Sequence, residues 1–357
     1  MDGPALYAII MAGGSGTRFW PASRRSRPKQ YLRIASERPL LLETWVRLEG
    51  FIPPERILVV TTVDQVDQVR ETLPDLPEEN ILAEPEARNT GPCVALAAFE
   101  IKRRDPDSIQ ILLPADHVIR PPQAFHRSLL AAAEEANQLG SLIVFGIRPS
   151  HPATGFGYIE AGEMSREVRH TPVYRVRQFV EKPDLRKAQE FLFQGSFFWN
   201  AGIFVWHTDA ICQAIADHMP ECSESLSVKR DPEDLARRYH ELPAQSIDVA
   251  VMERAPNVRM LPIDYFWSDV GSWDALGNVL EKDEEGNVVS GGAQLMTESS
   301  RSCIAHAPAG EMVALIGVHN VVVVHEGNAT LVCHRDRVQD VRALVERMRA
   351  GEGEEFL

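Results

Sequence analysis

The chain has 357 residues, 44% of them hydrophobic and 25% charged, a composition typical of a globular protein with a main domain and a smaller second one. Its formal net charge of −14 argues against a nucleic-acid-binding protein, whose binding domain is normally basic. No apolar run approaches the roughly 20 residues of a membrane span, and the N-terminus lacks the pattern of a signal peptide. Five scattered cysteines without a CxxC pair indicate reduced thiols. We therefore expect a cytoplasmic protein that binds neither nucleic acid nor membrane.

The first predicted element is a strand over residues 6–11 that runs into a glycine-rich turn. Gly13, Gly14 and Gly16 follow it, and then six cations occur between residues 18 and 33 with no acidic residue among them. Bare amides followed by cations suit a group with several negative charges, such as a nucleoside triphosphate. The alternative is a glycine turn beside a solvated basic loop. A Walker loop (GxxxxGK[ST]) and a dinucleotide fingerprint (GxGxxG) both fail to match.

The pattern that does match is GGxGTRFxP followed by a proline–lysine pair, whose lysine comes eleven residues after the arginine. This pattern resembles the signature loop of the sugar-1-phosphate nucleotidyltransferase family. The resemblance implies that the loop wraps the triphosphate of the incoming nucleotide, and that Arg18 and Lys29 act in catalysis. The loop residues expected to bind the nucleotide are Ala12, Gly13, Gly14, Gly16 and Thr17.

Helical and strand patterns alternate after this loop. We predict strands over residues 56–61, 81–84, 109–113 and 141–147, and helices over residues 41–48, 65–73, 90–102 and 121–139. This alternation implies right-handed βαβ crossovers, and so an α/β fold with a Rossmann-like, mostly parallel sheet flanked by helices. Ligands bind beyond the carboxyl ends of the strands in such sheets. The rule brings the segments 12–29, 84–92 and 114–117 to one crevice.

The segment Pro114-Ala115-Asp116-His117 follows a predicted strand, which puts Asp116 at its carboxyl end. A carboxylate at a strand end suits Mg²⁺, which takes oxygen ligands, although a cap of the following helix is an alternative. The sequence PADH resembles the mannose-1-phosphate guanylyltransferase branch of the family, since relatives that transfer uridylyl or thymidylyl groups usually carry a glycine–aspartate pair there. The resemblance implies that Asp116 is a catalytic ligand of Mg²⁺ and that Pro114 lies at the nucleotide. His117 is expected to be a packed residue.

The segment 84–92 also resembles that branch, in the loop that meets the base. Guanine presents N1–H and N2–H₂ donors, so the carboxylate of Glu84 is a chemically sensible reader of it. Asn89 and Thr90, either of which also suits the cap of the next helix, are further candidates for nucleotide binding. For each of these residues a plain strand-to-helix turn is the alternative.

The sequence FVEKP, at residues 179–183, ends an alternating strand predicted over residues 173–182. Glu181 can accept hydrogen bonds from hydroxyls and Lys182 can offer a point charge to a phosphate; a surface ion pair is the alternative. FVEKP resembles the second signature of the family, which implies that Glu181 and a catalytic Lys182 contact the sugar phosphate. The other residues expected to do so are Gly155, Tyr158 and Asn200, the last within a strand predicted over residues 199–206.

Asp269 follows another predicted strand, over residues 257–263, and precedes a glycine. The resemblance implies that Asp269 is the second Mg²⁺ ligand and meets Asp116 in space. The alternative is a helix cap, and one aspartate can serve both roles. Between these strands, residues 208–254 are predicted to be helical with breaks, and Asp248 is a secondary candidate for the sugar pocket.

The last part of the chain gives weaker signals. Residues 320–333 indicate a hairpin about Gly327-Asn328, and apolar residues from 338 to 348 fall on one helical face. In the family, this part carries a short left-handed β-helix or β-roll and a helix used in subunit contact. We therefore expect a catalytic domain over residues 1–280 with the nucleotide-diphospho-sugar transferase fold, a small β domain over residues 281–357, and a homodimer. Whether the terminal helix packs on its own chain or on a second subunit stays open.

Taken together, the resemblance implies Mg²⁺-dependent transfer of a guanylyl group from GTP to mannose-1-phosphate by direct in-line attack on the α-phosphorus. The products would be GDP-mannose and pyrophosphate. One alternative is a sibling uridylyl- or thymidylyltransferase that acts on glucose-1-phosphate. Another is a catalytically silent regulator that binds nucleotide sugars, against which the retained charged residues speak.

Overall fold

The computed structural model describes residues 3–14, 16–228 and 231–357. By packing, the chain divides into two compact units. The first unit consists of the chain up to Gly13, Leu48–Pro114 and Arg120–Phe266, and the second of Gly14–Arg47, Ala115–Ile119 and Trp267–Leu357. The predicted domain boundary at residue 280 stays a prediction.

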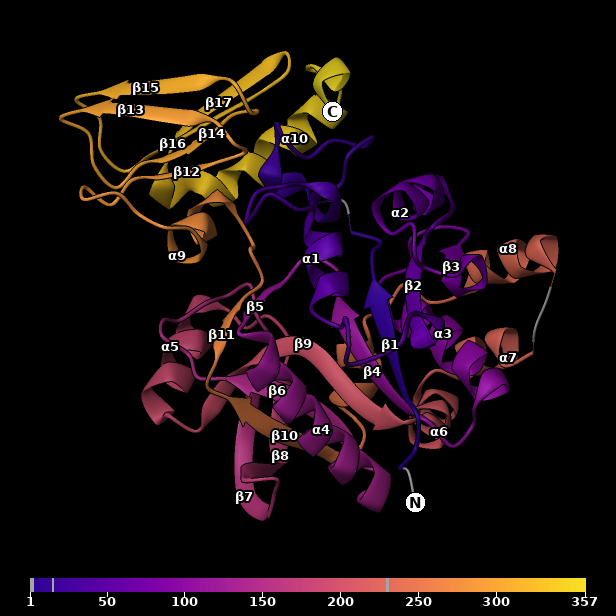
Figure 1. Ribbon diagram of the computed structural model, residues 1–357. Coiled ribbons are helices and arrows are strands. Elements are labelled where there is room, and N and C mark those ends of the chain that lie inside the picture. The colour runs from indigo at the N-terminus through magenta and orange to yellow at the C-terminus, as the bar shows by residue number, and fades with distance from the viewer. Residues whose placement is uncertain (1–2, 15, 229–230) are drawn as a thin grey trace. The chain divides into compact units, whose positions relative to one another are not determined.

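Nine strands form the sheet of the first unit (Figure 1): β1 (Leu6–Met11), β2 (Ile57–Thr62), β3 (Ile81–Glu84), β4 (Ile109–Pro114), β6 (Leu142–Ile147), β7 (Tyr158–Val168), β8 (Thr171–Val180), β9 (Phe197–His207) and β10 (Val258–Ile263). Their order across the sheet is β3-β2-β1-β4-β9-β6-β10-β8-β7. The first four run parallel, as do β6 and β10, whereas β9 and β8 pair antiparallel with their neighbours. The expected α/β sheet is confirmed, and its second half is mixed.

Helices cover both faces of this sheet. They are α2 (Val66–Thr72), α3 (Thr90–Arg104), α4 (Pro122–Leu139), α5 (Leu185–Gln194), α6 (Thr208–His218), α7 (Pro220–Leu226) and α8 (Pro232–Glu241). Buried residues of α3, α6 and α7 share one hydrophobic cluster with Tyr7 and Ile9 of β1. Successive strand residues point to opposite faces, and α4 packs against β4, β6 and β9 with Phe125 and Leu129 outside that cluster. The helices predicted at 65–73, 90–102 and 121–139 are thereby confirmed.

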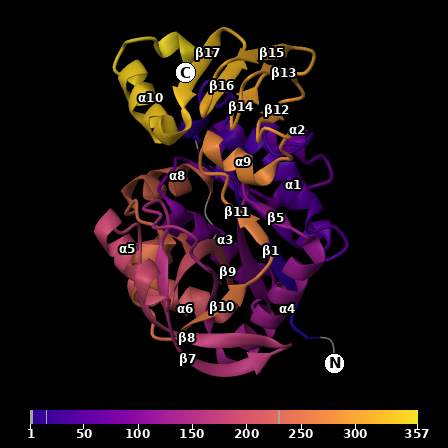
Figure 2. The same ribbon diagram turned by 90° about the vertical axis from the view of Figure 1, so that its left-hand side faces the viewer.

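The hairpin of β7 and β8 ends the strand order of the sheet (Figure 2), and the first residues of β7 also pair antiparallel with β9. Arg169 and His170 form its tip with φ values of 49° and 63°, which suits the type I′ turn that matches the twist of two-residue hairpins. The strand expected over residues 173–182 is found as β8. Its partner β7 was not predicted, because shifts in register interrupt the pairing and the alternation of exposure along it is irregular.

The second unit contains the strands β12 (Val288–Ser290), β13 (Gln294–Glu298), β14 (Ile304–His306), β15 (Met312–Ile316), β16 (Val321–Glu326) and β17 (Ala329–His334), and the helices α1 (Leu40–Val46), α9 (Leu276–Val279) and α10 (Val341–Arg349). β12, β14 and β16 pair in parallel, while β13 and β15, which alternate with them along the chain, pair in parallel with each other. This alternation is the arrangement of a β-helix and confirms the β-rich C-terminal part. β16 and β17 form the predicted hairpin.

The core of the second unit joins its N-terminal and C-terminal segments. Phe19 and Trp20 share a hydrophobic cluster with Trp273 and with Val341 and Val345 of α10. The indole of Trp20 donates to the backbone oxygen of Phe356 at 2.9 Å. The apolar face of α10 is therefore covered within its own chain, which answers the question that the sequence left open.

Two whole-chain expectations can be compared with the structure. None of the five cysteines, all within the described ranges, forms a disulfide, and four of them are buried, so the prediction of free thiols is confirmed. Among the helices that the structure describes, none combines the length and apolarity that a bilayer crossing requires.

Candidate active site

Three of the predicted catalytic residues meet in the second unit. Lys29, the first residue of the short turn η2 (Lys29–Tyr31), donates hydrogen bonds from Nζ to Asp116 Oδ2 and to the backbone oxygen of Asp269, both at 2.7 Å. Lys29 is only 7% exposed, whereas the Asp116 side chain is 31% exposed. A buried ammonium thus links two aspartates that are far apart in the sequence.

The charges in this cluster set the protonation states of Asp116 and His117. Burial acts to raise the pKa of the Asp116 carboxyl, but the charge of Lys29, aided by His117 and by hydrogen bonds, outweighs burial and holds the pKa below its usual range. Burial lowers the pKa of His117 to about 4, against the opposing charges of Asp116 and Asp269. The His117 ring packs edge-on against Trp267, with 5.3 Å between the ring centroids. At neutral pH, Asp116 is ionised and His117 is a neutral packed residue.

The two aspartates have the donor chemistry of a magnesium site. Mg²⁺ binds proteins through one or two carboxylates together with waters and phosphate oxygens. The Asp269 carboxylate lies close to Gly271, where an added Cβ would come within 2.7 Å of Oδ2. Within the described ranges, no group of three or more histidine, cysteine, aspartate or glutamate side chains gathers as a metal site. The carboxylates of Asp116 and Asp269 therefore fit an ion that takes its remaining ligands from water and phosphate.

Gly16 holds the glycine turn close to Lys29. Its backbone is left-handed, with φ 59° and ψ 33°, and it precedes the turn η1 (Thr17–Phe19). A Cβ added at Gly16 would lie 2.2 Å from the Cβ of Lys29. The Ser23 hydroxyl donates to the Gly16 oxygen at 2.7 Å. Both the backbone conformation and the contact therefore require glycine here.

We expect Gly16→Ala to lower Tm by roughly 5–10 °C, because the new methyl group must displace Lys29 or the turn and the left-handed backbone adds about 1 kcal/mol of strain. Gly14→Ala is the matched control. Gly14 is exposed, and an added Cβ would meet nothing within 4 Å, so this variant should keep Tm within about 2 °C. Thermal unfolding of both proteins checks the pair, and equal Tm values would contradict the close approach.

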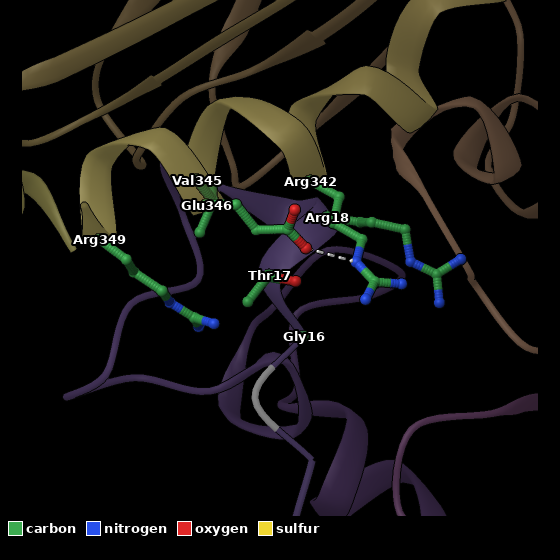
Figure 3. Close-up of a pocket in the computed structure, with 7 residues that line it drawn as sticks. All are labelled: Gly16, Thr17, Arg18, Arg342, Val345, Glu346 and Arg349. Atoms are coloured by element: carbon green, nitrogen blue, oxygen red, sulfur yellow. Dashed lines mark hydrogen bonds and ion pairs between the residues drawn. The ribbon is translucent and has the colours of Figure 1, made fainter. Parts of the chain in front are cut away.

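Arg18 lies in η1 with its side chain exposed. Together with Gly16 and Thr17 it lines one side of a cavity of about 330 Å³ within the second unit, and α10 forms the other side (Figure 3). Arg18 is thus close to Lys29 in the chain but lines a cavity whose remaining walls were not predicted.

The other predicted nucleotide-binding residues belong to the first unit. Glu84, at the end of β3, is 4% exposed and accepts a hydrogen bond of 2.5 Å from the Tyr239 hydroxyl of α8. Its second oxygen lies beside Gly13, where an added Cβ would come within 3.4 Å of it. Burial raises the pKa of Glu84 to about 7, while the Tyr239 bond acts in the opposite direction. Glu84 is a buried carboxyl that titrates near neutral pH.

The loop after Glu84 is hydrogen-bonded to the segment 240–247. Arg88 bonds to Glu86 and to the backbone oxygen of Leu242. The Asn89 side chain caps α3 by accepting from the Thr90 amide at 2.8 Å, and the Thr90 hydroxyl accepts from the Ile247 amide at 3.0 Å. Asn89 and Thr90 therefore have structural bonds, and their roles in nucleotide binding stay predictions. Two further predicted residues end buried strands of the sheet, namely Ala12 just after β1 and Pro114 at the last position of β4.

A second polar cluster in the first unit contains three of the predicted sugar-phosphate residues. Lys182 pairs with Glu181, whose carboxylate lies within 2.6 Å of a Cβ added at Gly157. The amide of Asn200 donates to Asp248 Oδ1 at 2.8 Å. Burial, and next to it the charge of Glu181, raises the pKa of Asp248 to about 6. Two carboxyls, an amide and one ammonium thus gather in one polar cluster, and the Glu181 carboxylate and Asn200 of this cluster lie close to Gly157.

The two remaining predicted sugar-phosphate residues, Gly155 and Tyr158, flank Gly157 in the chain. Tyr158 is completely buried and packs against Phe191, with 5.4 Å between the ring centroids. Gly155 is exposed, with nothing within 4 Å of an added Cβ. Their contacts with a sugar phosphate stay predictions.

Some residues that contact the predicted site residues were missed by sequence reasoning or given little weight. Tyr239 carries no local signal, since it occurs in a polar helix far from Glu84 in the sequence. Asp248 was only a secondary candidate, and Gly157 was not nominated. A glycine at the start of a buried strand indicates that another segment approaches its backbone closely. This signal could have nominated Gly157.

The comparisons with known proteins cover nearly the whole chain. Residues 7–286 match the family model described as nucleotidyl transferase, and residues 294–348 match the model of a MannoseP isomerase/GMP-like beta-helix domain. A mannose-1-phosphate guanylyltransferase from Klebsiella pneumoniae is 38% identical to this chain, over 98% of this chain and 75% of its own length.

Two further relatives agree with these matches. The xanthan biosynthesis protein XanB from Xanthomonas campestris pv. campestris is 38% identical, over 97% of this chain and 73% of its own length. Among solved structures, one titled mannose-1-phosphate geranyltransferase from Thermus thermophilus has a TM-score of 0.88 and 34% identity, and the match covers 96% of this chain and 99% of that one.

Proposed function

We propose, from the premise that the chain belongs to the nucleotidyl transferase family, that it transfers a guanylyl group from GTP to mannose-1-phosphate. The products are GDP-mannose and pyrophosphate. The names of the relatives that are 37–38% identical over nearly the whole chain favour this substrate pair. A thymidylyltransferase structure at 16% identity supports the shared fold alone, so the sibling reaction on glucose-1-phosphate is the weaker candidate.

The observation that carries the proposal is the buried Lys29 between Asp116 and Asp269. In the proposed reaction, a phosphate oxygen of mannose-1-phosphate attacks the α-phosphorus of GTP, and the bond from that phosphorus to the β-phosphate oxygen breaks. The attacking oxygen is already anionic at neutral pH, so the reaction needs no strong base. Such chemistry asks a protein for positioning and for neutralisation of charge; a fixed ammonium can neutralise phosphate charge, and two carboxylates can hold a divalent cation that would do the same.

The predicted catalytic residues, and two residues expected at the sugar, then have the following roles. Arg18 and the glycine amides bind the β- and γ-phosphates, and Lys29 stabilises charge at the α-phosphate. Asp116 and Asp269 hold a divalent metal, which we take to be Mg²⁺ because the ligands are carboxylates; when bound, it neutralises phosphate charge. Lys182 binds the phosphate of the sugar, while Glu181 and Asn200 orient its hydroxyls.

Two proposals concern organisation. The catalytic domain over residues 1–280 and the β domain over residues 281–357 are proposed as two domains of the sequence, which the ends of the two family matches support, and residues of both contribute to a common core. A homodimer is proposed because Met296, Met312 and Ile316 of the β13–β15 pair are 63%, 57% and 76% exposed, and apolar side chains gathered on one strand pair are a common feature of protein contact surfaces. The free thiols suit the reducing cytosol.

The experiment that tests the function is pyrophosphate release from GTP, UTP and dTTP with mannose-1-phosphate or glucose-1-phosphate, in the presence of Mg²⁺. We expect the highest kcat/KM for GTP with mannose-1-phosphate. Preference for dTTP or UTP with glucose-1-phosphate would establish the sibling reaction instead. Absence of turnover with every pair, in a protein that binds GDP-mannose, would make the chain a regulator.

We expect the KM for GTP to rise about tenfold between pH 8 and pH 6, because the pKa of Glu84 is about 7 and only its ionised form can accept both guanine donors. Glu84→Gln should have a high KM for GTP without this pH dependence. Glu79→Gln, at an exposed residue five positions earlier, is the matched control and should behave as wild type. The measurement is steady-state kinetics from pH 6 to 8 with saturating mannose-1-phosphate.

The same carboxyl affects folding stability with a defined sign. Its pKa is raised above the unfolded value of about 4.3, so the folded state disfavours the charge, and stability falls as pH rises from about 4.3 to 7. The free energy of unfolding of Glu84→Gln minus that of wild type should therefore increase from pH 5 to pH 8, by about 3 kcal/mol. A constant difference across this range would contradict the raised pKa.

A further inference from the structure

The cavity beside Arg18 has a cationic wall that the proposed function does not use. It is lined by Gly16, Thr17, Arg18, Arg342, Val345, Glu346 and Arg349, all in the second unit. Figure 3 shows α10 lying along the turn η1, with Arg342, Glu346 and Arg349 directed from the helix toward the cavity. Its volume of about 330 Å³ is at the small end of the range of ligand sites.

The spacing of these residues on α10 explains why they share the cavity. Positions 342, 346 and 349 differ by four and three residues, so they occupy one face of the helix. The neighbouring stripe contains Val341 and Val345, which are 3% and 2% exposed within the hydrophobic cluster that also holds Phe19 of η1. Because this packing fixes α10 against η1, it also fixes the charged face of the helix beside Arg18.

The charge of the cavity is strongly positive for this protein. Three guanidinium groups and one carboxylate line it, whereas the whole chain carries a formal charge of −14. Arg342 donates from Nε to Glu346 Oε1 at 3.0 Å, and in the described part of the chain neither Arg18 nor Arg349 forms an ion pair. Unpaired guanidinium groups around one cavity repel each other unless an anion binds between them, and their forked donors suit phosphate oxygens.

We propose that α10 contributes Arg342 and Arg349 to the binding of the terminal phosphates of the nucleotide and of the pyrophosphate that leaves. The proposal rests on the proposed function only in the choice of ligand, because Arg18 is the residue assigned to those phosphates. Arg342 and Arg349 lie beyond residue 286, outside the part that matches the nucleotidyl transferase model. The C-terminal helix thereby becomes a binding element of the reaction, in addition to its part in the core.

The test uses the full chain with Arg342→Ala, Arg349→Ala and the double variant. We expect the KM for GTP, and the KM for pyrophosphate in the reverse direction, to rise roughly tenfold in the double variant, with an unchanged KM for mannose-1-phosphate and an unchanged Tm. Arg347→Ala is the matched control, because Arg347 is on the same helix, is paired with Glu352 and does not line the cavity. Glu346→Gln removes the carboxylate from the cavity wall and should lower both KM values.

A purely structural role of these arginines predicts a different result, namely a lower Tm in the double variant with no selective change in KM. That result, or KM values for GTP and pyrophosphate within twofold of wild type, would overturn the proposal. Calorimetric titration with pyrophosphate alone separates this test from the proposed function, since it needs no turnover. Weaker pyrophosphate binding in the double variant supports the site even if wild type fails to use GTP, and equal binding removes it even if wild type is active.

Discussion

Asp269→Asn should reduce kcat by about 10²–10³-fold while the protein remains folded. The substitution removes one of the two carboxylates proposed to hold Mg²⁺, so the concentration of Mg²⁺ that gives half-maximal rate should also rise about tenfold or more. Folding should be affected little, because Lys29 bonds to the backbone oxygen of Asp269 and not to its carboxylate. Asparagine retains both this oxygen and the shape of the side chain that lies close to Gly271.

The matched control for this prediction is Asp264→Asn, an exposed residue five positions earlier that has no assigned role. It should retain the kcat and the Mg²⁺ dependence of wild type. The measurement is pyrophosphate release as a function of Mg²⁺ at saturating substrates, together with Tm for both variants. Turnover by Asp269→Asn close to that of wild type would remove Asp269 from the metal site.

The sheet of the first unit could be predicted from the sequence where local periodicity decides. The expected strands over residues 56–61, 81–84, 109–113 and 141–147 are found within one residue at each end. The β4 strand has apolar residues at every position except Gln110, as suits a strand buried on both faces. Asp116 could be nominated because it comes two residues after such a strand, at the edge where side chains of an α/β sheet meet ligands.

Elements outside the regular alternation were harder to predict. α5 was not among the predicted helices, although the sequence carries usable signals for it. Asp184 caps its start, and Gly195 ends it in a left-handed conformation. β7 offered none as clear, because its exposure pattern is broken by irregular pairing. The contact of Tyr239 with Glu84 depends on how α8 packs on the first unit, and no local property of either residue reports such a contact.

The cavity at Arg18 shows why a motif can be incomplete as a description of a site. The signature residues of the glycine turn are contiguous in the sequence, so their suitability for binding phosphate can be inferred from the sequence alone. Arg342 and Arg349 occur more than 300 residues later in an ordinary amphipathic helix, where charged residues are normally solvated. Only the packing of Val345 against the cluster that contains Phe19 places their side chains at the turn.

We expect Lys29→Met also to reduce kcat by about 10²–10³-fold, because it removes the ammonium assigned to charge on the α-phosphate. Its effect on the metal should be opposite to that of Asp269→Asn. Lys29 lies 2.7 Å from Asp116 and from the Asp269 oxygen, so its charge repels a divalent ion there, and without it the half-saturating Mg²⁺ concentration should stay equal or fall.

Asp269→Asn and Lys29→Met together separate metal binding from the stabilisation of charge on the α-phosphate in one assay. Lys102→Met is the control for Lys29→Met, since it breaks an exposed ion pair with Asp209 on the surface of the first unit, and exposed pairs contribute little. Tm of Lys29→Met should fall by a few degrees, because Asp116 loses a partner and the Asp269 oxygen a donor. If Lys29→Met has a raised half-saturating Mg²⁺ concentration and a normal kcat at high Mg²⁺, Lys29 only positions the aspartates. Its assignment to the α-phosphate would then be wrong.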